Sequence, residues 1–476
     1  METQALEKTF ATHDEFNRKP IAENIIRLLT SDIDLSPMVI DGSWGTGKTE
    51  FCQKLIRLME QQQLNYQPVY IDAFCSDHSG EPLLALLAEI IKACTPENVD
   101  GRPSEQRTNL TRKIAKVAGF GIKTTFKAAM GHVLKQNTDD LAEELQQIMN
   151  DDQEARSVAE TVTDTANTIA NHTIDVAVEA LLKEQIEAEK NLETLKSCLK
   201  ELAADKPIIL FIDELDRCRP DYAVDMLEVI KHVFDIENVK VVLVTNTKQL
   251  CAAINHRYGA EVDAQKYLDK FLKYSFALPD KIVAQSEEGR ALVSVHHFER
   301  LIKGSDIGGV LFSGYRVMDC INEMIKRNNL SLRETERLVR FLKIYHSLSH
   351  GFGDRNELPT LWLRLVGVFI FCFYPSLIDD INKNRTDARE FAQLFNLQSL
   401  PDMPDDPYYV KEVDVIAVML ISNSKIEDPR FILQGASEQN SYWQARIEER
   451  FGKGTMNLVL SILKETFRVL SLEQAA

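Results

Sequence analysis

A glycine-rich segment with one lysine carries the clearest chemical pattern of the chain. Residues 42–49 read Gly42-Ser43-Trp44-Gly45-Thr46-Gly47-Lys48-Thr49 and follow a short apolar run. The glycines let successive backbone N–H groups turn toward an anion, and a helix beginning near Lys48 directs its positive dipole end to the same point. We therefore expect these eight residues to cradle nucleotide phosphates. Lys48 would reach the β- and γ-phosphates, and the Thr49 hydroxyl would hold Mg²⁺. Trp44 is expected to pack rather than to read the base.

A second group of polar residues follows another apolar run, residues 207–213. The run is apolar throughout, as in a strand covered on both faces, and leads into Asp213-Glu214-Leu215-Asp216-Arg217-Cys218. An acid at the tip of a strand next to the phosphate loop can hold Mg²⁺ through its waters, and we predict this role for Asp213. The next acid can polarise an attacking water, a role we assign to Glu214, with Asp216 as the next candidate. The other interpretation is that these acids only cap the following helix.

Arginines meet a further need of phosphoryl transfer, because a guanidinium can neutralise charge that develops on the γ-phosphate. We predict a catalytic role for Arg217, whose other interpretation is a salt bridge with Asp216 or Asp221 at a subunit contact. Ser331-x-x-Glu334 is a capping-box pattern, which predicts a helix starting at Ser331 with Arg333 in its first turn. Arg333 is then either a nucleotide contact or a surface arginine. Arg219 and Arg337 are further candidates.

The elements that must position these residues alternate between helical and strand patterns. Apolar spacing predicts helices over 14–30, from 48 onward, over 82–93 and after Pro220, with strands at 37–41, 68–72, 207–213, 239–245 and 274–278. This alternation predicts an α/β fold with a parallel sheet. Together with the phosphate loop and the Asp213-Glu214 pair, it predicts a P-loop NTPase core of the ASCE type. The distance between loop and acid motif leaves room for an extra strand, 68–72, as in triphosphatases where a strand intervenes between the two. Beyond Asp280 the pattern is mainly helical, broken by turns such as Gly308-Gly309.

Length and composition limit the classes of protein to which the chain can belong. The chain has 476 residues and a net charge of −17, which argues against a generally cationic nucleic-acid binder. Its eight cysteines form no C-x-x-C pair and are expected to be reduced core residues of a cytoplasmic protein. The N-terminal residues are polar and acidic rather than a signal sequence. The longest apolar run, Leu365–Ile378, is too short to cross a bilayer and predicts a buried helix.

Residues 95–205 differ from the rest in their charge pattern. Residues 102–135 carry eight Lys or Arg and one acid, whereas residues 136–165 carry nine acids and one base. One interpretation is a pair of solvated helices that associate through opposite charge. The other is a basic amphipathic arm for a membrane surface, a nucleic acid or a partner subunit. We predict a core from 1–94 with 206–280, a helical insertion at 95–205, a helical lid at 281–350 and a mostly helical C-terminal domain at 351–476.

The acid motif and several other segments resemble the KAP family of P-loop NTPases. The specific part is Asp213 to Cys218, then Pro220, then Ile230-Lys231 in the following helix. Residues 17–22, 267–279 and 329–337 resemble further family elements in the same order. Two departures are visible. Glu214 stands where the family usually has Asp, and the fourth strand ends in Thr245-Asn246 rather than Asp. Either polar residue could sense the γ-phosphate.

The resemblance implies an ATPase that couples hydrolysis to the assembly or switching of a partner complex. It also implies ATP and Mg²⁺ as ligands, a homo-oligomer, and bacterial antiviral defence as one role. Many family members carry membrane helices where this chain has residues 95–205, which are too charged to span a bilayer, so a soluble form is expected. Two alternatives stay open. One is a nucleic-acid-dependent motor or loader using Lys113, Lys116, Lys123 and Lys127. The other is a membrane-surface scaffold using residues 110–134.

Overall fold

The computed structural model describes residues 9–94, 192–282, 291–313, 316–349, 352, 358–404, 410–431, 438–456 and 458–473. Contacts divide the chain into two units. The first contains Met1–Ser43 and Gly47–Leu278, and the second contains Trp44–Thr46 and Pro279–Ala476. The predicted boundary near residue 350 falls inside the second unit and stays a prediction. Most of the predicted insertion, including both charge blocks, lies outside the described residues, and its last part, 192–205, is helical.

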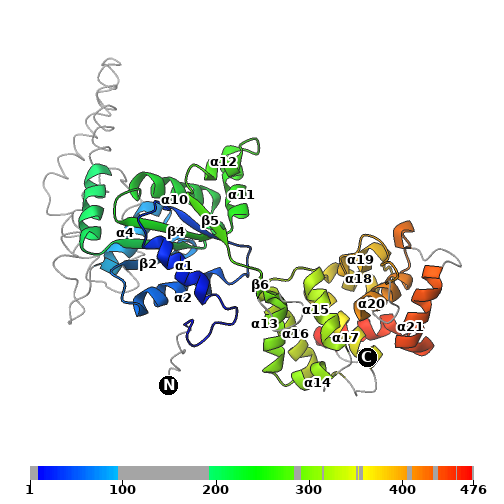
Figure 1. Ribbon diagram of the computed structural model, residues 1–476. Helices are drawn as coiled ribbons and strands as arrows, with labels where there is room; N and C mark the ends of the chain where they lie inside the picture. The colour runs from blue at the N-terminus through cyan, green and yellow to red at the C-terminus, as the bar shows by residue number, and fades with distance from the viewer. Residues whose placement is uncertain are drawn as a thin grey trace, which may run out of the picture. The chain divides into compact units, whose positions relative to one another are not determined.

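A five-stranded parallel sheet is the centre of the first unit (Figure 1). Its order is β2-β3-β4-β1-β5, and every pairing between neighbours is parallel. The strands are β1 (Met38–Asp41), β2 (Gln67–Asp72), β3 (Ile208–Asp213), β4 (Val239–Thr245) and β5 (Tyr274–Ala277). The predicted parallel α/β core is confirmed, with each strand within a residue or two of its predicted place.

Residues 68–72 do form a strand, β2, but the prediction that this strand lies between the two motif strands is wrong. β4 lies between β1, which leads into the phosphate loop, and β3, which leads into the acid motif. β2 instead forms the outer edge beyond β3. All six residues of β3 and six of the seven in β4 are buried, whereas only Val69 and Ile71 are buried in β2. Strands apolar on both faces suit the sheet interior, and the alternating strand suits its edge.

Helices cover both faces of this sheet (Figure 1). On one face α1 (Lys19–Leu29) and α2 (Lys48–Gln61) pack against one set of alternating strand residues, including Ile209, Phe211 and Val244. On the other face the intervening residues, such as Leu210 and Ile212, pack against a larger helical layer. That layer contains α4 (Pro82–Cys94), the helical residues 192–205, α10 (Pro220–Val233), α11 (Thr247–Tyr258) and α12 (Ala264–Leu268). Side chains of successive strand residues therefore point to different layers.

The first helix is shorter than the predicted span of 14–30. Asp14 accepts hydrogen bonds from the backbone N–H groups of Arg18 (2.8 Å) and Lys19 (2.9 Å), so the preceding residues form a turn. Asn17 has a positive φ of 51°, which is incompatible with a right-handed helix. α1 therefore begins at Lys19, with Pro20 in its first turn, where a missing N–H is tolerated.

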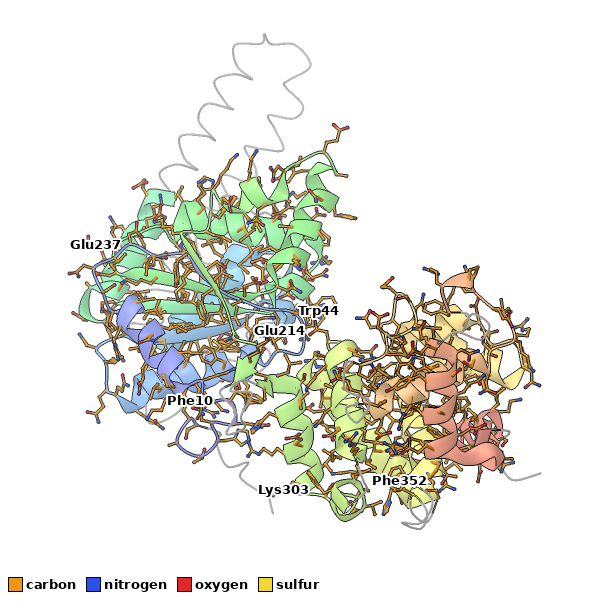
Figure 2. The ribbon with its side chains drawn as sticks, turned by 45° about the vertical axis from the view of Figure 1, so that its right-hand side comes forward. Phe10, Trp44, Glu214, Glu237, Lys303 and Phe352 are labelled. Atoms are coloured by element: carbon orange, nitrogen blue, oxygen red, sulfur yellow. The ribbon has the colours of Figure 1, made fainter. Side chains whose placement is uncertain are left out.

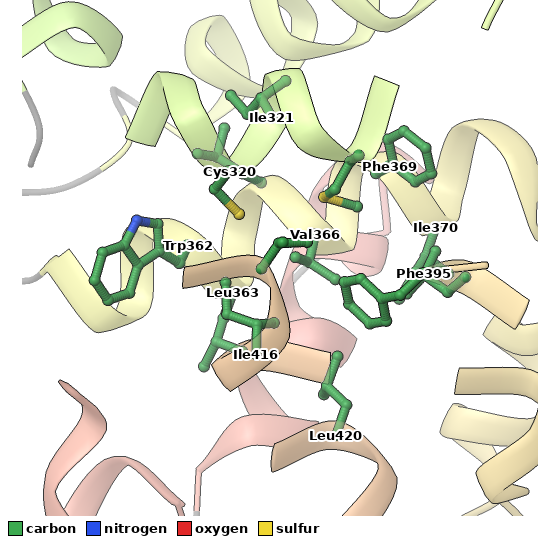
Figure 3. Packing of buried hydrophobic residues seen from close by; sticks show 14 of the residues in the cluster. Cys320, Ile321, Trp362, Leu363, Val366, Phe369, Ile370, Phe395, Ile416 and Leu420 are labelled. Atoms are coloured by element: carbon green, nitrogen blue, oxygen red, sulfur yellow. The ribbon is translucent and has the colours of Figure 1, made fainter. Parts of the chain in front are cut away.

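In its described residues the second unit is mainly helical, with a short antiparallel hairpin. The hairpin strands are β6 (Lys281–Ile282) and β7 (Ala291–Leu292). The helices are α13 (Val293–Lys303), α14 (Gly308–Ser313), α15 (Val317–Arg327), α16 (Leu332–Leu348), α17 (Leu358–Phe373), α18 (Pro375–Asn382), α19 (Ala388–Leu394), α20 (Glu412–Ser422), α21 (Glu438–Met456) and α22 (Val459–Leu470). They share one apolar core, part of which Figure 3 shows around Trp362, Val366 and Ile416.

The apolar run Leu365–Ile378 is buried helix, as predicted, although it spans two helices. α17 ends at Phe373, and Tyr374, with a non-helical backbone of φ −130° and ψ 62°, separates it from α18, which begins at Pro375. Residues of α17 from Leu361 to Cys372 are largely buried in the core. Among the described residues, no helix combines the length and apolar character that a membrane span requires.

The predicted turn at Gly308-Gly309 is wrong, because these glycines begin helix α14. A Cβ at Gly308 would lie 2.7 Å from the carbonyl oxygen of Ile302 near the end of α13. Glycine at position 308 therefore allows α14 to begin close to the end of α13, so it permits close packing of the two helices and does not form a turn.

The cysteines are all free thiols, as expected. Five are buried, but Cys75 is exposed, so the expectation that all are core residues is wrong at that position. Cys75 lies in α3 (Ala73–Ser76), a short helix directly after β2, where its thiol donates to Asp72 Oδ2 at 3.3 Å.

Candidate functional site

The phosphate loop joins β1 to α2 with two glycines in the left-handed region of the backbone. Gly45 has φ 77° and Gly47 has φ 82°, and Gly47 is the N-cap of α2. A Cβ at Gly45 would also lie 2.8 Å from the Ser331 Oγ. Both conformation and space therefore require glycine at position 45. The helix begins at Lys48, as predicted, so its first N–H groups and its dipole face the loop.

Lys48 is the loop's cation, and it is almost completely buried, with 8% of its surface exposed. Its Nζ donates to the carbonyl oxygens of Gly42 (2.6 Å) and Ser43 (3.2 Å). Burial lowers the pKa of this ammonium, and the negative charges of Asp216, Asp213 and Asp41 oppose that shift. The ammonium thus lies within the field of the acid motif, and its three donors can turn from loop carbonyls to phosphate oxygens.

Aspartates end three of the strands at the carboxyl edge of the sheet: Asp41, Asp72 and Asp213. Asp41 accepts the Thr247 N–H at 2.9 Å, and Asp72 accepts the Cys75 N–H at 2.9 Å as the N-cap of α3. Asp41 therefore holds the first residue of α11, and Asp72 caps α3. Asp213 differs in being almost completely buried, and it follows Phe211 on the sheet face covered by α2.

Asp213 is 1% exposed, and its carboxylate accepts two hydrogen bonds. Its Oδ1 accepts the backbone N–H of Glu214 at 2.8 Å, and its Oδ2 accepts the Tyr70 hydroxyl at 3.1 Å. The Thr49 hydroxyl lies close enough to the carboxylate to lower its pKa. Burial raises the pKa of Asp213, while these hydrogen bonds and Lys48 lower it. The two residues predicted to hold Mg²⁺ thus lie near each other.

Glu214 lies at the point where the chain leaves β3 (Figure 2). Its left-handed backbone, with φ 59°, ends the strand and begins the short helix η2 (Leu215–Arg217). The side chain forms no cap of η2, which disfavours the helix-capping interpretation. Instead Glu214 Oε1 pairs with Arg217 Nη2 at 2.8 Å. Burial raises the pKa of Glu214, and the Arg217 charge opposes that shift.

Asp216 is held by the tip of the neighbouring strand. The buried Thr245 hydroxyl, at the end of β4, donates to Asp216 Oδ1 at 3.1 Å. Among the carboxylates that raise the pKa of Lys48, Asp216 has the largest effect. Asn246 accepts the Lys248 N–H at 3.2 Å as the N-cap of α11. Of the two polar residues at the family's usual Asp position, Thr245 is therefore the one connected to the acid motif.

The candidate arginines have different surroundings. Arg217 pairs with Glu214 rather than with either predicted aspartate. Arg219 binds Asp77, in the short helix η1 (Asp77–Ser79), through its backbone N–H (3.0 Å), its Nε (3.0 Å) and its Nη2 (2.6 Å, to the carbonyl). Arg337 lies over the rings of Phe341 and Phe373.

Arg333 lies in the first turn of α16, in the second unit. The predicted capping box is confirmed, because Ser331 and Glu334 exchange both hydrogen bonds. Within the same unit the Leu332 N–H donates to the Gly45 carbonyl at 3.0 Å. Trp44 leaves 49% of its surface exposed, more than a core tryptophan would.

Sequence reasoning missed Tyr70 and Asp77 at this site. Tyr70 is 143 residues from its partner Asp213, and Asp77 is 142 residues from Arg219. An alternating strand that ends in Asp72 was visible, but nothing in its spacing indicated which strand would lie beside β3. Such contacts depend on the order of strands in the sheet.

The donor set fits a magnesium ion that is bound mainly by its substrate. Thr49 and Asp213 supply a hydroxyl and a carboxylate, the oxygen ligands that Mg²⁺ prefers. Among the described residues there is no group of three or more His, Cys, Asp or Glu placed to form a metal cage. That arrangement agrees with Mg²⁺ sites that use one or two side chains plus phosphates and waters.

The chain matches one family model and is similar to two known proteins. A family model described as "KAP family P-loop domain" matches residues 18–349. The chain is similar to the "Phage T7 exclusion protein" of Escherichia coli (strain K12), with 23% identity over 269 residues, or 56% of the chain. The match spans 33% of that protein's length. A structure of the Aeropyrum pernix ORC2 protein aligns over 94% of both chains with 11% identity and a TM-score of 0.32.

Proposed function

Because the chain belongs to the KAP family of P-loop domains, we propose that it hydrolyses ATP in the presence of Mg²⁺. The observation that carries this proposal is that Thr49 lies close enough to the buried Asp213 carboxylate to lower its pKa, with Glu214 next to Asp213 in the chain. This placement brings the phosphate loop to the acid motif. ATP is preferred to other nucleotides on the family resemblance alone.

In the proposed reaction, the loop N–H groups and Lys48 bind the β- and γ-phosphates. Thr49 and Asp213 would hold Mg²⁺, which when bound offsets phosphate charge. Glu214 accepts a proton from water as the water oxygen attacks the γ-phosphorus. The bond between that phosphorus and the bridging oxygen breaks, leaving ADP and inorganic phosphate. Asp216 orients Lys48, and Arg217 holds Glu214.

Two substitutions test these roles. Lys48→Ala should abolish nucleotide binding, because it removes the loop's cation. Glu214→Gln should bind Mg-ATP with near-normal affinity and lose about 100-fold or more in kcat, the size of effect expected from a general base. Lys92→Ala on α4 and Glu60→Gln on α2 are matched controls, since both residues are exposed within the same unit. Full turnover by Glu214→Gln would show that another residue activates the water, and Asp216 would be tested next.

We further propose that nucleotide turnover drives assembly or switching of a complex, as a homo-oligomer or with a protein partner, in antiviral defence in the bacterial cytoplasm. The similarity to a phage exclusion protein supports this role. Arg333, in the first turn of α16, is a candidate for a nucleotide contact. Light scattering with and without ATP tests assembly. Plaque counts on bacteria that express the wild type or Lys48→Ala test exclusion of phage T7. Equal plaque counts in the two strains would contradict a nucleotide-dependent role against that phage.

A further inference from the structure

We propose that Tyr70 is a positioning residue that makes nucleotide binding depend on Mg²⁺, because its hydroxyl fixes the Asp213 carboxylate. This inference rests on the proposed function, since it assigns Asp213 to the metal. It adds a residue from outside both sequence motifs. Tyr70 lies on β2, the outer strand, whereas the motifs follow β1 and β3.

The sheet register explains how Tyr70 reaches Asp213. β2 and β3 run parallel, with Tyr70 opposite Phe211 and Asp72 opposite Asp213. Because side chains alternate along a strand, Tyr70 and Asp213 share the sheet face covered by α2. The Tyr70 ring is partly buried in the apolar cluster on that face, together with Phe211 and residues of α2. Its phenol therefore extends along the face toward the carboxyl edge of the sheet and ends at Asp213.

The hydroxyl completes the protein's hold on the carboxylate. The Glu214 N–H binds Oδ1 at 2.8 Å, and the Tyr70 hydroxyl binds Oδ2 at 3.1 Å, so each oxygen has its own donor. Neither donor can move easily, because one is backbone and the other is on a ring packed in the core. With both oxygens fixed, the carboxylate cannot rotate about its terminal bond. A carboxylate has about four acceptor sites, so each oxygen keeps capacity for a further partner.

A role limited to packing makes a different prediction from a positioning role. Phenylalanine fills nearly the same volume as tyrosine, so a packing role predicts little change in Tyr70→Phe. A positioning role predicts that Asp213 becomes mobile and holds the metal less well. Losing a partner of a metal-ligating group typically lowers metal affinity about 10- to 100-fold.

The experiment measures the affinity of the full chain for a fluorescently labelled ATP, once in EDTA and once in saturating Mg²⁺. The ratio of the two Kd values reports how strongly the metal contributes to binding, independently of turnover. Tyr70→Phe should reduce this ratio about tenfold or more and leave Kd in EDTA unchanged. Tyr66→Phe, which alters a phenol packed against the same cluster just before β2, is the matched control and should keep the wild-type ratio.

A double-mutant cycle tests whether Tyr70 acts through Asp213. In an Asp213→Asn background, Tyr70→Phe should have no further effect on the ratio. Tyr70→Met removes the hydroxyl with a different side chain and should repeat the result if Tyr70→Phe folds poorly. A wild-type ratio in both Tyr70 variants, or an equal loss in Tyr66→Phe, would overturn the inference. If the wild type itself shows no binding, or no effect of Mg²⁺, the proposed function fails instead.

Discussion

The contact between Asp77 and Arg219 makes a quantitative prediction that separates a structural arginine from a catalytic one. Asp77 is 6% exposed and accepts two hydrogen bonds through its carboxylate, one from the Arg219 backbone N–H and one from Nε, both at 3.0 Å. Asp77→Ala removes both acceptors and leaves the backbone N–H without its partner. Arg219→Ala removes only the side-chain bonds and keeps the backbone bond. The two variants should therefore differ in stability.

The expected sizes follow from burial. Loss of the acceptor for a partly buried N–H costs about 1–3 kcal/mol. The Arg219 side chain is 64% exposed, so its ion pair is screened and contributes about 0.2–1 kcal/mol. We expect Asp77→Ala to lower the free energy of unfolding by about 2–3 kcal/mol, and Arg219→Ala by about 0.5 kcal/mol. For a unit of this size the corresponding falls in Tm are about 4–10 °C and about 1–2 °C.

Thermal unfolding followed by circular dichroism and steady-state ATP hydrolysis are the two assays. Asp77→Asn keeps one acceptor oxygen and should fall between the two alanine variants in Tm. Arg219→Ala should keep turnover within about twofold of the wild type, because its side chain anchors η1 and does not touch Glu214. The reasoning is refuted if Arg219→Ala lowers Tm as much as Asp77→Ala. It is refuted equally if Arg219→Ala loses hydrolysis with an unchanged Tm, which would make Arg219 part of the chemistry.

Two further predictions concern the ion pairs of Arg217 with Glu214 and of Asp34 with Lys273. Arg217→Met should lower kcat about tenfold with little change in nucleotide affinity, because Glu214 loses the guanidinium, 2.8 Å away, that orients it. An unchanged kcat in steady-state assays would contradict this prediction. Asp34, before β1, binds Lys273, before β5, at 2.7 Å, and this hydrogen bond lowers the pKa of Asp34. Because the pKa of Asp34 is lower in the folded state, this carboxylate stabilises the fold at pH values above its unfolded-state pKa of about 3.9. That stabilisation is lost as the pH falls through the folded-state pKa. Asp34→Asn should therefore unfold at a slightly lower temperature than the wild type at pH 7 and at the same temperature near pH 2, whereas an equal difference at both pH values would contradict the assignment.

The phosphate loop and the acid motif could be predicted because each is a local pattern. Gly45 and Gly47 must be glycines for reasons of backbone conformation, and an apolar strand before a polar turn is visible in any short window. The capping box at Ser331 was equally local, and it formed as expected. In these segments the residues that define the structure lie within a few positions of one another.

The wrong predictions of a turn at Gly308-Gly309 and of a helix over 14–30 also have local causes. Gly308 is a helix start rather than a turn because the end of α13 lies against it, and sequence spacing does not report that neighbour. The first helix is shortened by Asp14, whose side chain binds two backbone N–H groups that a helix would otherwise use. Polar side chains that compete for backbone groups shift helix boundaries without changing the apolar pattern.

A parallel α/β core, the two motifs and the chemistry that their residue types allow could be predicted from the sequence. Which side chains support those motifs depends on the tertiary structure. Strand order placed β4 between the motif strands and β2 outside them, which brought Thr245 to Asp216 and Tyr70 to Asp213. Such contacts join residues far apart in the chain, and they depend on which apolar strands are buried on both faces. Burial of that kind is a property of the assembled sheet, so no single segment of the sequence contains it.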